Sequence, residues 1–111
     1  MASVRAGSFS FEYFPPRTPE AQARLSEARA ALRALGPHYV SVTFGAGGST
    51  REHTFETVAQ IHAEDRVPVA PHLSCIGATR AEVDALLDRY RVLGIRRLVA
   101  LRGDAPSGMG A

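Results

Sequence analysis

The sequence predicts an α/β fold of parallel strands joined by right-handed helical crossovers. Two observations lead to this prediction. Four short segments have the composition or the alternation of strands, and their centres recur about every 29 residues, a spacing typical of a βα unit. Each gap between these segments holds apolar residues at helical spacing. The expected order over the 111 residues is therefore strand-helix-strand-helix-strand-helix-strand.

The four expected strands are short. They are Ser8–Phe14, Tyr39–Phe44, Val67–Leu73 and Arg97–Leu101. The second and the fourth are rich in β-branched or large apolar residues, as strands buried on both faces are. Strands of this kind belong to a sheet that helices cover, which agrees with the α/β class.

Capping signals mark where the expected helices begin and end. Thr18–Glu20 supplies an N-cap, a proline at the first helical position and an acid in the first turn. Ser49 and Thr79 are each followed three residues later by glutamate, which predicts capping boxes for the second and third helices. Gly36–Pro37 and Gly94 predict the ends of the first and third helices.

Two architectures share this alternation, an open doubly wound sheet and a (β/α)8 TIM barrel. The regular step and the absence of a long or unusual crossover favour the barrel. A complete barrel typically needs about 250 residues. We therefore expect residues 1–111 to form a single incomplete barrel domain, the N-terminal half. The loop composition of Pro106–Ala111, where a fourth helix should follow, also predicts a truncated chain or a fragment.

Composition excludes several classes of function. All 13 basic residues are arginine, and the absence of lysine excludes Schiff-base chemistry and a Walker phosphate loop. Arginines and acids are interspersed, so the net charge of +2 forms no basic stripe for nucleic acid. No apolar segment approaches the length of a membrane span. The single cysteine, Cys75, cannot form an internal disulfide, which favours a cytoplasmic protein, and we expect it to be a small core residue rather than a nucleophile.

Polar side chains gather at the carboxyl ends of the expected strands, where parallel α/β folds carry their functional residues. These ends supply Glu12, Thr43, His72 and the triplet Arg102–Asp104. Their convergence favours an enzyme site more strongly than any one of the residues does, but it does not identify the reaction.

Glu12 is the strongest candidate for a catalytic residue, because it lies among aromatic residues and before two prolines. Desolvation in such a setting disfavours the charged carboxylate and favours a protonated general acid. The alternative is an ordinary strand residue that faces solvent or pairs with an arginine. A parallel barrel strand has no solvated face, which favours the catalytic interpretation.

The remaining candidates each have a plainer alternative. The arginine of Arg102–Asp104 offers donors for a phosphate group, but the triplet also suits a salt-bridged turn. His72 is a candidate base or ligand and otherwise a core histidine, and Thr43 is otherwise a buried strand threonine. The loop Gly45–Thr50 suits an anion at a helix start but departs from the dinucleotide fingerprint. The other histidines lie at a strand start or on helices, so we expect no metal site.

Four segments resemble, in order and spacing, the N-terminal half of the methylenetetrahydrofolate reductase family. They are SFEYFPPRTPE, VSVTFGAGGSTRE, PVAPHLSCIGAT and GIRRLVALRGDAP, and the resemblance runs from Ser8 to Gly110. It implies a flavin-dependent (β/α)8 barrel that transfers a hydride from NADH or NADPH through FAD to 5,10-methylenetetrahydrofolate. The product is 5-methyltetrahydrofolate, which serves one-carbon and methionine metabolism. The resemblance further implies a folate substrate and a homo-oligomer for the full-length protein.

The resemblance also implies roles for individual residues. Glu12 matches the general acid that helps to open the five-membered ring of the folate, and Asp104 matches an aspartate near flavin and pterin. Both are therefore expected to act in catalysis and in substrate binding. The positions that match cofactor contacts are Thr43, Phe44, Ala46, His72, Arg102, Gly103 and Asp104.

The chain departs from the family pattern in a few places. Phe44 stands where tyrosine is common, Tyr13 where phenylalanine is common and Ser74 where threonine is common. The larger departure is that the later strands of the family, which complete the FAD and folate sites, are not among the 111 residues. Two alternatives stay open: a truncated half-barrel that cannot bind FAD alone, and a different barrel enzyme that binds a phosphorylated substrate.

Overall fold

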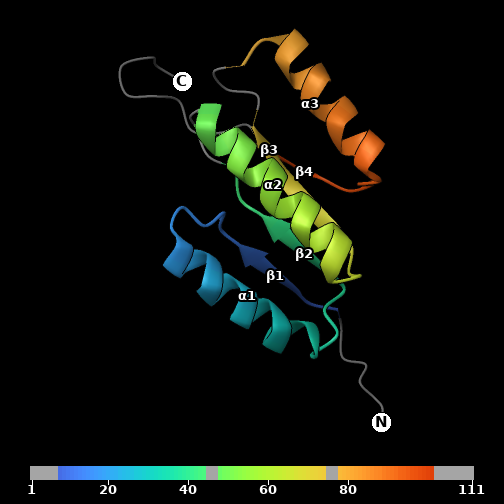
Figure 1. Ribbon diagram of the computed structural model, residues 1–111. Helices are drawn as coiled ribbons and strands as arrows, with labels where there is room; N and C mark the ends of the chain where they lie inside the picture. The colour runs from blue at the N-terminus through green and yellow to red at the C-terminus, as the bar shows by residue number, and fades with distance from the viewer. Residues whose placement is uncertain (1–7, 45–47, 75–77, 102–111) are drawn as a thin grey trace.

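The computed structural model describes residues 8–44, 48–74 and 78–101, and Figure 1 shows how their elements are arranged. In chain order the elements are β1 (Ser10–Tyr13), α1 (Pro19–Arg33), β2 (Tyr39–Val42), α2 (Gly48–Glu64), β3 (Val69–Ser74), α3 (Arg80–Leu93) and β4 (Val99–Leu101). This alternation over the described residues confirms the predicted types and order. All four strands are shorter than their predicted segments, because pairing covers only part of each segment.

The strands form one parallel sheet in the order β1-β2-β3-β4. Strands that follow one another in the chain are neighbours in the sheet, and α1, α2 and α3 lie on the same face of it (Figure 1). A doubly wound sheet reverses its strand order at a switch point and carries helices on both faces, whereas a barrel adds each strand beside the previous one. The described residues therefore have the predicted fold class, that of consecutive units of a (β/α)8 barrel.

Capping interactions hold the ends of α1 and α3 as predicted. The Thr18 hydroxyl accepts a hydrogen bond from the Ala21 N–H at 3.0 Å, and the first helical residue is proline. At α3, the Glu82 N–H donates to the Thr79 hydroxyl at 3.1 Å, and the Thr79 N–H donates to the Glu82 carboxylate at 2.8 Å. Gly94 ends α3 with a left-handed φ of 98°, a conformation that glycine adopts without steric cost.

The start of α2 differs from the prediction. The helix begins at Gly48, so Ser49 lies within it and is not the N-cap. Glu52, which was expected to complete a capping box with Ser49, instead accepts two hydrogen bonds from Arg89 of α3, at 3.2 and 2.7 Å. A guanidinium group binds both oxygens of a carboxylate in this bidentate geometry. The pair therefore joins α2 to α3, and the prediction of a capping box at Ser49 is wrong.

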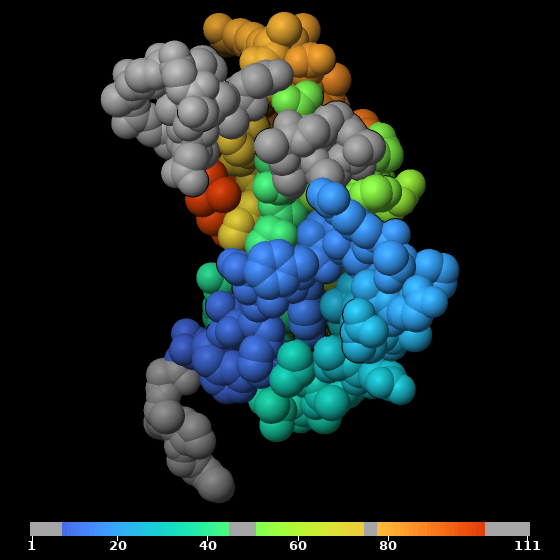
Figure 2. Space-filling view, turned by 90° about the vertical axis from the view of Figure 1, so that its left-hand side faces the viewer, coloured from blue at the N-terminus to red at the C-terminus, as the bar shows by residue number. Residues whose placement is uncertain are grey.

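The core lies between the sheet and the helices, because side chains alternate between the two faces of each strand. Its buried members are Tyr13, Val40, Val42, Val69 and Leu73 from the strands, Val58 and Ile61 from α2, and Leu86 and Tyr90 from α3. The opposite face of the sheet carries Glu12, Ser41 and His72, and none of the described helices covers it. Figure 2 looks onto the β1 edge of this sheet, where β1 and α1 form the near surface. None of the helices in the described ranges is long and apolar enough to cross a membrane.

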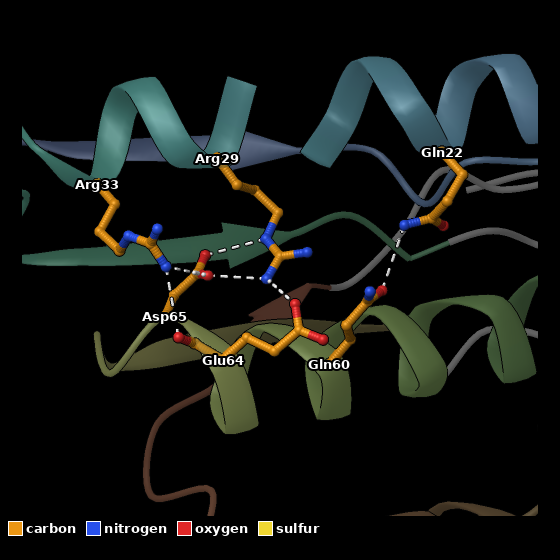
Figure 3. Close-up of polar contacts among 6 residues, drawn as sticks. All are labelled: Gln22, Arg29, Arg33, Gln60, Glu64 and Asp65. Atoms are coloured by element: carbon orange, nitrogen blue, oxygen red, sulfur yellow. Dashed lines mark hydrogen bonds and ion pairs between the residues drawn. The ribbon is translucent and has the colours of Figure 1, made fainter. Parts of the chain in front are cut away.

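A charged network joins α1 to the end of α2 (Figure 3). Nε and Nη2 of Arg29 donate to the two carboxylate oxygens of Asp65, at 3.0 and 2.7 Å, and both side chains are 4% exposed. Arg29 also donates to Glu64 at 2.8 Å, and Arg33 donates to Asp65 at 3.1 Å. The hydrogen bonds to Asp65 raise the pKa of Arg29 above its ordinary value. Each buried charge is thus compensated by its partner, which makes either one costly to remove alone.

Tyr90 carries a buried hydroxyl that finds no hydrogen-bond partner among the described residues. Burial raises the pKa of this phenol, and its ring lies 5.2 Å from that of Phe55 between centroids. We expect Tyr90→Phe to keep the ring contact and to raise the free energy of unfolding by about 1 kcal/mol, because an unsatisfied buried donor is removed. Urea denaturation of the chain measures this, with Tyr39→Phe as a control. A clear loss of stability in Tyr90→Phe would contradict the prediction.

Candidate active site

Glu12 and His72 lie together on the sheet face opposite the helices. Oε1 of Glu12 is 3.3 Å from Nε2 of His72, although β2 separates their strands. The register explains this contact. Glu12 pairs with Ser41 of β2, and Ser41 pairs with Ala70 of β3. His72 follows Ala70 by two residues and so shares its face. The structure therefore brings two of the predicted site residues into contact.

Ser41 makes the contact between Glu12 and His72 possible. It lies on the same face as both residues, on the strand between them, and is buried. Two strand spacings amount to about 10 Å, so the two longer side chains must lean toward each other to meet. A serine beneath them leaves the space for this, and a large side chain in its place would stand between them.

The surroundings of Glu12 differ from the predicted apolar setting. Its side chain is 50% exposed, and Phe14 is 69% exposed. The desolvation predicted for Glu12 is thus absent from the described part of the chain, and that expectation is wrong. The reason is that Glu12 lies on the sheet face without helices, while its neighbour Tyr13 takes the buried side. His72 is better shielded, with a side chain that is 13% exposed.

The end of β2 is held from two sides. The Thr43 N–H donates to the Tyr13 carbonyl at 3.0 Å, which continues the pairing with β1 by one residue. The Thr43 carbonyl accepts a hydrogen bond from the hydroxyl of Thr54, on α2, at 2.8 Å. Because the alternation of β2 continues through this residue, Thr43 presents its side chain on the face that carries Glu12 and His72.

Phe44 lies on the other side of the sheet from Glu12. It is packed against the core beneath the helices, and the Arg51 guanidinium lies 5.9 Å from the centroid of its ring. The structure therefore does not bring the Phe44 ring together with Glu12 and His72.

A cavity of about 270 Å³ opens between the strand ends and the helices α2 and α3. Its charged lining residues, Arg51, Glu52, Glu82 and Arg89, were not predicted as part of a site. Hydrogen bonds from Arg89 lower the pKa of Glu52, and Arg51 lies 3.9 Å from Glu82. These charges pair with one another and join α2 to α3, so they do not indicate a ligand site. No local pattern could have found the pair, since Glu52 and Arg89 are 37 residues apart.

Four of the predicted site residues lie outside the described residues, together with Cys75. They are Ala46, Arg102, Gly103 and Asp104. The last described residue of β4 is Leu101, which pairs with Ser74 at the carboxyl end of β3, the edge near His72. Within the described ranges, no group of three or more histidine, cysteine, aspartate or glutamate residues could hold a metal ion.

Comparison with known proteins shows which family the sequence matches. The family model described as methylenetetrahydrofolate reductase matches residues 2–111. The 5,10-methylenetetrahydrofolate reductase of Salmonella typhimurium is 45% identical over 101 residues, which are 91% of this chain and 34% of that protein. The Escherichia coli protein of the same name is 44% identical over the same shares.

A plant protein extends the comparison beyond bacteria. Methylenetetrahydrofolate reductase (NADH) 1 of Zea mays is 39% identical over 101 residues, which are 91% of this chain and 17% of that protein. The chain thus spans about a third of the length of the bacterial relatives and less of the plant one. The family match covers nearly every residue, including all four strand ends on which the candidate site is built. The chain belongs to the methylenetetrahydrofolate reductase family.

Proposed function

We propose that this chain supplies part of the active site that reduces 5,10-methylenetetrahydrofolate to 5-methyltetrahydrofolate, with a hydride from NADH or NADPH that passes through FAD. Family membership supports the reaction class. The observation that carries the proposal is the contact between Glu12 and His72 on the open face of the sheet. An acid and an imidazole at the carboxyl ends of parallel strands lie where such barrels bind their substrates.

The residues on this face fit a flavin. Ser41 and Ala70 are small and leave a shallow surface, and Thr43 and His72 offer hydrogen-bonding groups to the polar edge of a planar ring. We propose Thr43 and His72 as flavin contacts, together with Ala46, Arg102, Gly103 and Asp104. Phe44 completes the positions that match flavin contacts in the family, and it has the weakest support, because its ring packs toward Arg51 on the helix side. A bound FAD would supply the hydride-transfer chemistry between the nicotinamide and the folate.

The proposed chemical role of Glu12 is to hold a proton at Oε1 and to give it to the ring nitrogen of the folate as the five-membered ring opens. Nε2 of His72 lies 3.3 Å from that oxygen. His72 is therefore proposed to exchange a proton with the Glu12 carboxyl group. Asp104 is proposed to stabilise the cationic folate that results. An interaction with a charge that develops only along the reaction path stabilises the transition state more than the substrate, and it therefore lowers the barrier. An interaction that binds substrate and transition state equally does not.

The proposal also covers the donor and the assembly. NADH is named for the maize relative, and it is the first donor to assay here, with NADPH as the comparison. The complete enzyme is proposed to be a cytoplasmic homo-oligomer.

The test uses a chimeric reductase in which this chain replaces the matching third of the Escherichia coli relative. The purified chimera is expected to be yellow, to show flavin absorbance and to oxidise NADH or NADPH in the presence of 5,10-methylenetetrahydrofolate. A folded chimera that binds FAD but does not reduce the folate would contradict the proposal. The 111-residue chain alone, titrated with FAD, tests the alternative of a half-barrel that cannot bind the cofactor by itself.

A further inference from the structure

We propose that Thr54 of α2 is a positioning residue for the flavin-contacting end of β2, an inference that rests on the proposed function. Thr54 is fully buried, and its hydroxyl donates to the Thr43 carbonyl at 2.8 Å. It does not lie on the open face of the sheet, so it acts on a bound flavin only through Thr43.

The sequence just after β1 explains why Thr43 needs a donor from a helix. In a parallel ladder, a residue donates its N–H to one residue of the neighbouring strand, and its carbonyl accepts from the residue two positions further along. Thr43 donates to Tyr13, so the residue due to donate to its carbonyl is Pro15. Proline has no N–H. The ladder with β1 therefore ends one bond early, and the Thr54 hydroxyl supplies the missing donor.

The other neighbour of β2 does not take over this role. Pairing between β2 and β3 ends at Val42 and Pro71, whereas β3 continues to pair with β4 up to Ser74 and Leu101. Beyond Val42 the end of β2 thus leaves β3, and α2 holds it instead. The Thr43 peptide is fixed by β1 at its N–H and by Thr54 at its carbonyl. This fixes the Thr43 side chain on the face where the flavin is proposed to bind.

Thr54→Val in the chimeric reductase removes the donor and keeps the shape of the side chain. We expect the dissociation constant for FAD to rise about tenfold, since a partly buried carbonyl loses its partner and Thr43 loses its fixed position. Thr54→Ser keeps the hydroxyl and should restore the wild-type constant. Thr57→Val, at another buried threonine of the same helix, is the matched control and should bind FAD as the wild type does.

Pro15→Ala provides a second test of the inference, because it restores a backbone N–H that can donate to the Thr43 carbonyl. Combined with Thr54→Val, it is expected to recover both folding and FAD affinity. The inference is overturned if Thr54→Val binds FAD normally, if Thr57→Val weakens FAD equally, or if Thr54→Val fails to fold and Pro15→Ala does not rescue it. A wild-type chimera that binds no FAD would instead refute the proposed function, so the two failures are distinct.

Discussion

Glu12→Gln is expected to slow folate reduction by the chimeric reductase about 10²- to 10⁴-fold, the usual contribution of a general acid, while the reduction of FAD by NADH proceeds as before. Glutamine keeps the size of the side chain but has no acidic proton to give to the folate nitrogen. The nicotinamide half-reaction needs no such proton. The two half-reactions should therefore separate, because only one of them uses the carboxyl group that lies 3.3 Å from His72.

Stopped-flow absorbance of the flavin measures the two half-reactions one at a time. Glu27→Gln, at an exposed position of α1, is the matched control and should leave both unchanged. If Glu12→Gln slowed both half-reactions equally, Glu12 would be supporting the structure of the site instead of donating a proton.

Arg29→Ala is expected to lower the free energy of unfolding by about 3–5 kcal/mol, because it leaves the carboxylate of Asp65 buried without its main partner. The pair makes two hydrogen bonds at 3.0 and 2.7 Å. The Asp65 side chain is only 4% exposed, so water cannot replace the lost guanidinium group. Arg33 also reaches Asp65, but its own side chain is 47% exposed. Arg33→Ala should therefore cost only about 1 kcal/mol or less.

Urea denaturation of the chain and its variants tests the network. Arg29→Met combined with Asp65→Leu should lose less stability than Arg29→Ala alone, since no charge is then left buried without a partner. A loss in Arg29→Ala no larger than that in Arg33→Ala would show that the buried pair does not hold α1 against α2.

The fold was predictable because its signals are local. The proline at the start of α1 and the glycine at the end of α3 each act within a few residues, and the structure agrees with them. The 29-residue step follows from the succession of these local signals along the chain, and the observed element order agrees with it. The capping box at Ser49 failed for the opposite reason. Glu52 had a choice between a neighbour three residues away and Arg89 on another helix, and the bidentate pair took precedence.

The site was predictable only in part. Alternation along parallel strands puts Glu12 and His72 at the same edge of the sheet, but their contact depends on the register and on the small Ser41 between them. The desolvation of Glu12 was expected from its aromatic neighbours, whose rings turn out not to cover it. The Thr54 hydroxyl could not be found from sequence, because the absence of a donor at Pro15 matters only once the register is known.

The central claim is that Glu12 and His72 work as one proton-handling pair, and a double-mutant cycle on folate reduction tests it most directly. Rates are measured for Glu12→Gln, His72→Gln and the double variant of the chimeric reductase, after the flavin has been reduced. We predict a coupling energy of about 1–3 kcal/mol, with the double variant little slower than the slower single one. Additive losses in the two single variants would contradict the claim and would leave two independent residues on one sheet face.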